Sequence, residues 1–387
     1  MPSPISKSEL QKLHTYLDQR QLEILELIKS VVEAESPSGD ADGNREVVDL
    51  LVRNAESINC VDSIERVSVP ELGEHLVIGA FQKAASEGHV MLIGHTDTVH
   101  ARGSLSVNPW RSDADRVYGP GIFDMKANCV LALEALRALS LANVIPSAVT
   151  LVLTCDEEIG SFSGWPLLER LAHQLEPRCA LVLEPSAAGR VKTARKGTAM
   201  FTMTIEGKAA HAGLDPGKGA SAIVELARQI ERLHLLNNSG GITLNVGVVR
   251  GGTRSNVVAA EAIAEIDVRF ATATESQQIM KILMQPDSFD ERVRVKVTGG
   301  INRPPLERTP AVAELFERAR SIADSLGFEL GEAQVGGASD GNFLAAMGIP
   351  VLDGLGVDGD GAHAIHEHII ASAIPRRGAL LAGLIAQ

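Results

Sequence analysis

Ionisable side chains follow the ends of three apolar segments of the chain. They are His95 and Asp97 after residues 90–93, Glu157 and Glu158 after residues 148–154, and Glu184 after residues 180–183. Continuous apolar runs of this length are typical of strands buried on both faces of a parallel sheet, and ligands bind at the carboxyl ends of such strands. Carboxylates gathered at one edge repel one another unless cations lie between them. The pattern therefore predicts a metal site, although a single acidic strand end is usually a solvated loop.

His95 and Asp97 have a spacing that suits metal binding. Side chains two residues apart leave the same face of an extended strand, so Asp97 can hold the imidazole of His95 in one tautomer while the other ring nitrogen binds a metal. The alternative is a hydrogen-bonded pair with a structural role. The recurrence of acidic groups at other strand ends favours the metal site, and we expect His100, His366 and His368 beside the ligands or at the surface.

Asp124 lies in a glycine-rich loop, residues 118–128, that runs into an alanine- and leucine-rich helix at about residues 126–141. This helix is apolar almost all round, which predicts that it is buried under the sheet and holds the loop rigidly. Two roles are open for Asp124. It could cap the helix, which is the commonest role of aspartate at a helix start, or it could join the metal site.

The composition limits the classes of protein that the chain can be. Its 387 residues exceed one ordinary core and predict two domains, and its net charge of -13 argues against nucleic acid as a partner. No window approaches the roughly 18 consecutive apolar residues of a membrane helix, and the amino terminus has no secretory pattern. The four cysteines include no C-x-x-C pair, which indicates reduced thiols. We therefore expect a cytoplasmic protein without membrane contact.

The order of elements predicts one domain inserted into another. Buried strands alternate with helical patterns in residues 1–193, and this α/β texture resumes in residues 306–387. Between them, in residues 194–305, strands alternate apolar and polar positions in the order β-α-β-β-α-β of a ferredoxin-like unit. The predicted fold class is thus α/β, with a doubly wound, mostly parallel sheet and an inserted ferredoxin-like α+β domain. Residues 8–34 have a helical pattern, and residues 257–270 a strand pattern.

Six motifs in order resemble the family of co-catalytic zinc metallopeptidases that includes glutamate carboxypeptidase, acetylornithine deacetylase, succinyl-diaminopimelate desuccinylase and aminoacylase. The motifs are Gly94-His95-Thr-Asp97-Thr-Val, Gly119-Pro-Gly-Ile-Phe-Asp124-Met-Lys, Asp156-Glu157-Glu158-Ile-Gly, Leu183-Glu184-Pro, Gly207-Lys-Ala-Ala-His211-Ala-Gly, and His363 before Glu367. The tail Ser372-Ala-Ile-Pro-Arg-Arg377 resembles the glutamate carboxypeptidase branch most closely. Ala127 replaces the usual glycine after Asp-Met-Lys, and Ala338 stands where that branch often has glycine, which could alter the substrate pocket.

The resemblance implies two metal ions per chain. One would be bound by His95, Asp124 and Glu184 and the other by Asp124, Glu158 and His363, so that Asp124 bridges them. Nitrogen and carboxylate ligands without thiolate suit Zn²⁺, with Co²⁺ or Mn²⁺ as alternatives. The charges of two Zn²⁺, three ligand carboxylates and one hydroxide sum to zero, so the cluster can be buried.

Further roles follow from the same resemblance. His211 and Asn256 match residues that in relatives reach the active site of the partner subunit and stabilise the oxyanion, which implies a homodimer formed through the inserted dimerisation or lid domain. His211 could otherwise be a turn residue beside Gly213. Arg269 and Arg303 are candidates for binding a substrate carboxylate bidentately. Arg303 is favoured by the resemblance, whereas Arg269 could simply be solvated.

The leading functional hypothesis is a zinc carboxypeptidase that releases a C-terminal glutamate-like residue from a small peptide or N-acyl substrate. Asp97 would orient His95, and Glu157 would be the general base that activates water and protonates the leaving nitrogen. An N-acyl amino acid deacylase or desuccinylase on the same scaffold is the alternative enzyme. A catalytically silent binding scaffold is a third possibility, against which the presence of every ligand and of Glu157 argues.

Overall fold

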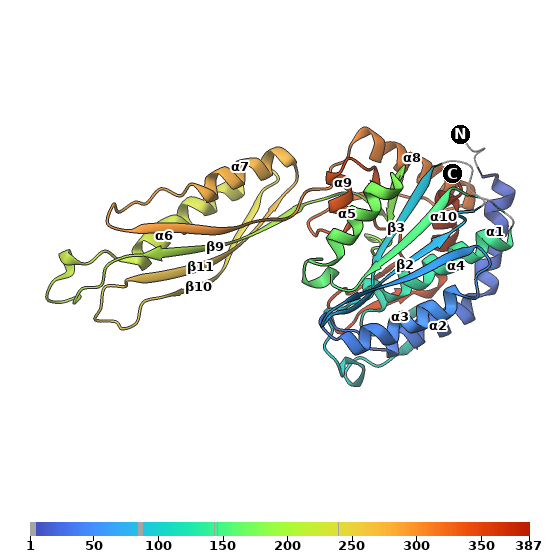
Figure 1. The fold of residues 1–387 in the computed structure, drawn as a ribbon, viewed down its shortest axis with the longest axis horizontal. Coiled ribbons are helices and arrows are strands. Elements are labelled where there is room, and N and C mark those ends of the chain that lie inside the picture. The colour runs from blue at the N-terminus through green and yellow to red at the C-terminus, as the bar shows by residue number, and fades with distance from the viewer. Residues whose placement is uncertain (1–4, 84–87, 143, 145, 239) are drawn as a thin grey trace. The chain divides into compact units, whose positions relative to one another are not determined.

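The computed structural model describes residues 5–83, 88–142, 144, 146–238 and 240–387, which form two compact units (Figure 1). The main unit contains Met1–Ala194, Arg308–Gln334 and Ser339–Gln387, and the inserted unit contains Arg195–Glu307 and Val335–Ala338. The boundaries expected from the sequence, 193/194 and 305/306, lie one and two residues away from these. Residues 335–338 were expected in the second part of the main domain, but they cluster with the inserted unit.

The main unit is built on a six-stranded sheet. Its order is β1 (Val61–Val69), β2 (Gly73–Ala80), β6 (Ala148–Thr154), β3 (His89–His95), β7 (Cys179–Val182) and β14 (Val351–Leu352). The strands from β6 to β14 pair in parallel, whereas β1 and β2 pair antiparallel. The sheet is mostly parallel, as predicted, so the carboxyl ends of β3, β6 and β7 meet at one edge.

Helices cover the faces of this sheet. They are α1 (Lys7–Gln19), α2 (Gln21–Glu33), α3 (Ala41–Ala55), α4 (Ala127–Leu141), α5 (Gly164–Leu175), α8 (Pro310–Leu326), α9 (Gly341–Ala346) and α10 (Ile374–Ile385). The helical pattern of residues 8–34 is divided into α1 and α2 at Arg20. The backbone of Arg20 leaves the helical region, with φ -97° and ψ 7°, and its guanidinium binds the buried Glu134 at 3.0 Å.

Helix α4 is the central helix of the main unit. Of its 15 residues, 12 are buried, and it packs against α1, α2, α3 and α10. The all-round apolar pattern correctly predicted this burial. Because α4 begins at Ala127, directly after the loop that carries Asp124, the core holds that loop from its C-terminal side.

Smaller elements complete the main unit. A four-stranded sheet has the order β15 (Gly359–Asp360), β16 (His368–Ile370), β5 (Arg116–Tyr118) and β4 (Arg111–Asp113), and β8 (Val191–Arg195) pairs with β13 (Glu332–Val335). Short helical turns are η1 (Ser104–Ser106), η2 (Ile122–Lys126), η3 (Glu157–Ile159) and η6 (Ala371–Ala373). The β5–β16 pair brings the segment before the Asp124 loop beside the segment after His363.

The inserted unit has the predicted β-α-β-β-α-β order. Its elements are β9 (Gly197–Glu206), η4 (Pro216–Lys218), α6 (Ala222–His234), η5 (Leu235–Asn238), β10 (Thr243–Gly251), β11 (Glu261–Phe270), α7 (Ala273–Met284) and β12 (Arg294–Arg303). The sheet is antiparallel in the order β10-β11-β9-β12, with α6 and α7 packed against it, which is the ferredoxin-like arrangement (Figure 1). The strand expected over residues 257–270 begins only at Glu261.

Each unit has its own hydrophobic core. Residues from α4, α10 and the main sheet form one cluster, and residues from β9, β11, α6 and α7 form another. The ends of the inserted unit are paired with each other, since Arg195 and Leu306 exchange two backbone hydrogen bonds of 2.9 and 3.0 Å. Within the described residues, the structure contains no helix long and apolar enough to cross a membrane.

Candidate active site

Asp124 lies between four other ionisable side chains at the carboxyl edge of the main sheet. Its Oδ1 is 3.3 Å from His95 Nε2, and its Oδ2 is 3.4 Å from His363 Nε2. His95 Nε2 is also 3.5 Å from Glu184 Oε1, and His363 Nε2 is 3.2 Å from Glu158 Oε1. The group therefore divides into two clusters that share Asp124, and in each cluster three potential ligand atoms lie within 4.8 Å of one another.

Different elements supply these side chains. His95 ends β3, Glu158 lies in the turn η3 after β6, and Glu184 lies two residues beyond β7. His363 comes from the loop between β15 and β16, where its backbone has a left-handed φ of 63°. His95 is fully buried, whereas the side chain of His363 is about half exposed. The two clusters thus differ in access to solvent.

His95 is fixed so that one ring nitrogen faces the carboxylates. Its Nδ1 lies 2.9 Å from the backbone oxygen of Asp97, to which it donates, and 3.4 Å from the Asp97 carboxylate. Because Nδ1 donates to Asp97, Nε2 is the ring nitrogen that faces Asp124 and Glu184 and that would be available to a metal ion. The nearer contact of Nδ1 is thus with the backbone oxygen of Asp97 rather than with its carboxylate.

The carboxylate of Asp97 has another set of partners. It accepts hydrogen bonds from the hydroxyl of Ser38 at 2.6 Å and from the backbone amides of Glu157 and Glu158, each at 3.2 Å. Asp97 therefore holds the turn that carries both glutamates. The side chain of Glu158 is buried, and Glu157 is half-buried.

Asp124 does not act as a helix cap. Its φ of -117° and ψ of 89° lie outside the helical region, and α4 has no side-chain hydrogen bond at its start. Its carboxylate instead faces the two imidazoles. Of the two roles open from the sequence, the structure therefore supports membership of the charged cluster.

The carboxylates of the clusters favour the protonated form of both imidazoles. Burial acts to lower the pKa of His95, but Asp124, Asp97 and Glu184 raise it well above its usual value of 6.5. Asp124 and Glu158 raise the pKa of His363 to about 10. Burial raises the pKa of Glu158, with a further contribution from the charge of Asp124 and an opposing one from His363. The directions of these shifts indicate that the carboxylates favour a neighbouring positive charge.

The donor set fits two divalent metal ions. Asp124 Oδ1 and Glu158 Oε1, one in each cluster, are buried and accept no hydrogen bond from the described part of the chain. A buried carboxylate oxygen in that state is costly unless a cation binds it. Imidazole nitrogen and carboxylate oxygen without thiolate are ligands that suit Zn²⁺. The residues of both clusters therefore match a dinuclear metal site.

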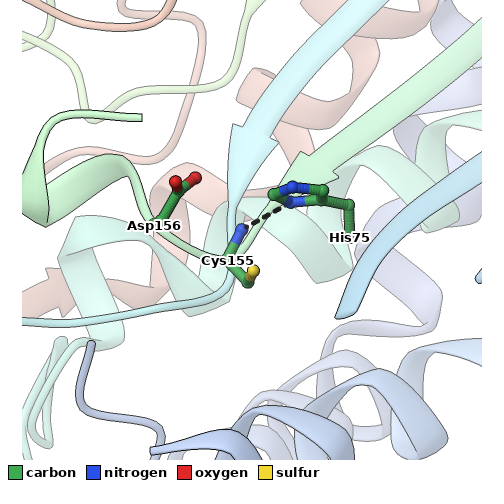
Figure 2. A group of neighbouring side chains, drawn as sticks. All are labelled: His75, Cys155 and Asp156. Carbon is green, nitrogen blue, oxygen red and sulfur yellow. Dashed lines mark hydrogen bonds between the residues drawn. The ribbon is translucent and has the colours of Figure 1, made fainter. Parts of the chain in front are cut away.

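A third group of potential ligands lies nearby, formed by His75, Cys155 and Asp156 (Figure 2). His75 Nδ1 accepts the backbone amide of Cys155 at 3.1 Å, and Asp156 accepts hydrogen bonds from Ser163 and from the amide of Gly164. Burial raises the pKa of the Cys155 thiol, which disfavours the thiolate that a metal would bind. We interpret this group as a hydrogen-bonded anchor for the start of the Glu157 turn. Sequence reasoning missed it because His75 is remote in the chain.

The residues expected to act from the inserted domain all lie in the inserted unit. His211 and Asn256 are exposed and lie side by side, since His211 pairs with Val257 and the Asn256 carbonyl accepts the amide of Ala212 at 3.0 Å. Arg269, on β11, is paired with Asp267 through two hydrogen bonds of 2.8 and 3.0 Å. Arg303 ends β12 and is buried, with Nη1 3.4 Å from the Asn302 side chain.

Lys192 is a neighbour of the site that sequence reasoning did not single out. It lies on β8 and is buried, and its Nζ is 4.0 Å from Glu184 Oε2. A buried lysine is rare without an anionic partner. The sequence did not indicate this contact. Lys192 lies eight residues after Glu184, and the local pattern does not show that β8 brings it back beside that residue.

Comparison with known proteins agrees with this geometry. Residues 91–387 match the family described as peptidase family M20/M25/M40. Carboxypeptidase G2 from Pseudomonas sp. (strain RS-16) is 30% identical over 372 residues, which cover 94% of this chain and 88% of that protein. Succinyl-diaminopimelate desuccinylase from Wolinella succinogenes is 26% identical over 301 residues, which cover 73% of this chain and 79% of the relative.

A solved structure shares the fold. Aminopeptidase PepT from Bacillus cereus ATCC 10987 has a TM-score of 0.79 at 22% identity, covering 95% of this chain and 98% of that one. The match to the family over residues 91–387, and the 30% identity to carboxypeptidase G2 along nearly the whole chain, extend the likeness from fold to family. The chain therefore belongs to peptidase family M20/M25/M40, and it is an enzyme of the metallopeptidase and amidohydrolase class.

Proposed function

We propose that this enzyme is a di-zinc hydrolase that cleaves an amide bond to release a C-terminal glutamate-like amino acid from a small peptide or N-acyl substrate. The observation that carries the two-metal assignment is the position of Asp124. Each of its two oxygens faces a different imidazole, at 3.3 and 3.4 Å. Asp124 would be shared by two ions, one held with His95 and Glu184 and the other with Glu158 and His363.

The general base in this proposal is Glu157. Its backbone amide is held by Asp97, and its neighbour Glu158 belongs to the cluster, so the two side chains can serve different partners from one turn. Glu157 takes a proton from the attacking water and later delivers it to the leaving nitrogen. When bound, two Zn²⁺ lower the pKa of water and polarise the amide carbonyl. Co²⁺ or Mn²⁺ could replace Zn²⁺ with these ligands.

His211 and Asn256 are proposed to stabilise the oxyanion. His211 Nδ1 accepts the backbone amides of Gly213 and Leu214 at 3.2 and 3.1 Å. In a neutral ring the hydrogen must then lie on Nε2, which makes this exposed nitrogen a donor. An oxyanion requires such a preorganised donor. The turn that holds His211 is therefore compatible with the catalytic role.

The proposed assembly is a homodimer formed through the inserted unit, in which His211 and Asn256 serve the active site of the partner. β10 is an edge strand of the inserted sheet, and Val248 and Val249 on it are exposed. Ile223 and Val224 on the adjoining helix α6 are exposed too. A second chain can pair with the free edge of such a strand and pack against the apolar side chains beside it. This exposed strip supports the dimer.

The substrate carboxylate requires a cationic partner, for which Arg303 is the first candidate. Arg269 is the weaker one, because Asp267 already occupies its guanidinium. Lys192 adds positive charge beside Glu184 in the main unit. Similarity to carboxypeptidase G2 favours carboxypeptidase activity, whereas the desuccinylase relative keeps an N-acyl amino acid deacylase or desuccinylase as the second candidate. We propose a cytoplasmic location, which the four free cysteines support.

A substrate panel tests the proposal. The zinc-loaded enzyme would be assayed with N-acyl glutamates, dipeptides that end in glutamate, N-succinyl and N-acetyl amino acids, and the same compounds with a C-terminal amide. Highest kcat/KM for substrates with a free C-terminal glutamate would support the carboxypeptidase. Preference for the acyl group irrespective of the amino acid would support the deacylase instead. The Glu157→Gln variant controls for contaminating hydrolases.

A further inference from the structure

Glu367 lies under the loop that presents Asp124, although it is far from it in the sequence. It is fully buried, and it follows His363 by four residues. The backbone turns between them, since Ala364 and Glu367 donate their amides to the carbonyls of Gly361 and Ala364 at 2.8 and 3.1 Å. β16 then begins at His368 and pairs with β5, which ends directly before the Asp124 loop.

Four hydrogen-bond donors converge on the Glu367 carboxylate. Oε1 accepts the backbone amides of Phe123 and Asp124, at 2.8 and 2.9 Å. Oε2 accepts the amide of Gly121 at 2.8 Å and the Nε2 hydrogen of His100 at 2.5 Å. A carboxylate is the side chain that accepts at both ends, so Glu367 matches these four donors.

We propose that Glu367 is a positioning residue for the metal centre, which fixes Asp124 as the bridging ligand and locks the Asp124 loop to the His363 loop. His100 assists by holding Glu367 in place. The inference rests on Asp124 bridging two metals, as proposed above. Glu367 itself acts on the metals only through the backbone of residues 121–124.

The local backbone explains why the loop needs this support. Gly121 is left-handed, with φ 68°, and a Cβ at this position would lie 2.4 Å from Thr98 Cγ2. Asp124 and Met125 have non-helical φ and ψ inside the segment. Regular α-helical hydrogen bonds therefore do not stabilise this segment. The backbone amides of Gly121, Phe123 and Asp124 donate to the carboxylate of Glu367 instead. Residues that orient metal ligands in this way typically contribute 10- to 100-fold to metal affinity or activity.

The test is zinc affinity, measured on the metal-free full-length protein by competition with a chromogenic chelator. In Glu367→Gln the shape is kept, but the end of the side chain that carries the amide nitrogen can no longer accept from its two donors, whichever way the amide is turned. We expect zinc affinity to fall by about 10- to 100-fold, with KM for the preferred substrate unchanged at saturating zinc. A folded Glu367→Gln protein with wild-type affinity for both metals would overturn the proposal.

Glu225 provides a matched control in the inserted unit. It is also buried, and it accepts the backbone amides of Phe289 and Asp290 together with the side-chain amide of Gln229. Glu225→Gln should lower the midpoint of thermal unfolding but leave zinc affinity at the wild-type value. An equal loss of affinity in both variants would show a general effect of instability and overturn the specific role of Glu367.

His100 provides the second variant if Glu367→Gln fails to fold. His100→Ala removes one of the four donors and should weaken zinc binding, and His100→Gln restores a donor at the position of Nε2 and should recover most of the affinity. Equal affinity of the two variants would overturn the role of His100 and Glu367. The readout needs no substrate. Fewer than two zinc ions on the wild-type protein would refute the two-metal function, whereas two zinc ions with unaltered variants would refute only this inference.

Discussion

The carboxylate of Asp97 accepts a hydrogen bond from the backbone amide of Glu157, at 3.2 Å. One residue thus links the strand end that carries His95 to the turn that carries the proposed base. A carboxylate can accept from the Glu157 amide, the Glu158 amide and Ser38 at once, whereas an asparagine must turn its amide nitrogen towards at least one of these donors.

Asp97→Asn is therefore expected to displace the Glu157 turn as well as His95. We predict a fall in kcat of about 10- to 100-fold, the range for residues that orient metal ligands, and weaker zinc binding. Steady-state kinetics and chelator competition measure the two effects. Asp290→Asn, which changes a carboxylate in the inserted unit that pairs with Arg292, is the control. Wild-type kcat in Asp97→Asn would contradict the linking role.

Replacement of Glu157 by glutamine tests the base directly. The side chain keeps its size but cannot take a proton, so kcat should fall by roughly 10²- to 10⁴-fold. Zinc content should stay at the wild-type level, because Glu157 is not among the cluster ligands. Metal analysis and kcat on the same preparation measure both. If activity is retained, another group must be the base.

Chelation tests the metal centre. Removal of the metals leaves the carboxylates of Asp124, Glu158 and Glu184 uncompensated, so the thermal midpoint should fall, on the order of 10 °C if both sites are well saturated beforehand. Added Zn²⁺ should restore it, and elemental analysis should give about two metals per chain. Mg²⁺ as the added ion is the control. Saturation at one metal per chain, or an unchanged midpoint, would rule out the two-metal site.

Mixed dimers test whether His211 serves the partner. His211→Ala and Glu157→Gln chains should each be nearly inactive alone, but one of the two sites in a mixed dimer has neither defect. Random pairing of equal amounts makes about half of the dimers mixed, so about a quarter of wild-type activity should return after co-expression. Verified mixed dimers without recovery would place His211 in the site of its own chain or outside catalysis.

The pH dependence of stability tests the burial of Cys60. Burial raises its pKa from 9.0 to about 11 in the folded protein. Between these values the unfolded thiol has lost its proton while the folded one keeps it, so the unfolded state binds fewer protons and stability falls as pH rises. Urea unfolding from pH 8 to 10.5 should show a smaller alkaline loss in Cys60→Ala than in the wild type. Equal slopes would mean that Cys60 ionises freely.

The sequence was informative wherever local pattern determines position. Buried strands that end in ionisable residues predicted which edge of the sheet carries His95, Glu158 and Glu184, because parallel strands end together. The burial of the helix after Asp124 was predicted because its sequence is apolar on almost every side. The β-α-β-β-α-β order likewise followed from periodicity in residues 194–305.

Contacts between distant segments could not be predicted in this way. Three hydrogen bonds depend on tertiary packing: the backbone amides of Glu157, Cys155 and Asp124 donate to the side chains of Asp97, His75 and Glu367, respectively. No glycine or proline marks the break at Arg20 that divides residues 8–34 into two helices. The break occurs where Arg20 forms an ion pair with Glu134, which is distant in the sequence. The left-handed backbone of His363 is equally invisible in the sequence.

The paired backbones of Arg195 and Leu306 allow most of the inserted unit to be removed as one segment, with residues 335–338 of that unit remaining in the chain. The chain leaves the main unit and returns to it at neighbouring points, so a short turn in place of residues 196–305 would span the gap. All five proposed metal ligands lie outside that stretch. Such a deletion should give a protein that still binds zinc but has lost turnover, and that is monomeric if the inserted unit forms the proposed dimer. It would also allow inserts from related enzymes to be exchanged on one metal-binding frame, so that metal binding and substrate choice could be engineered separately.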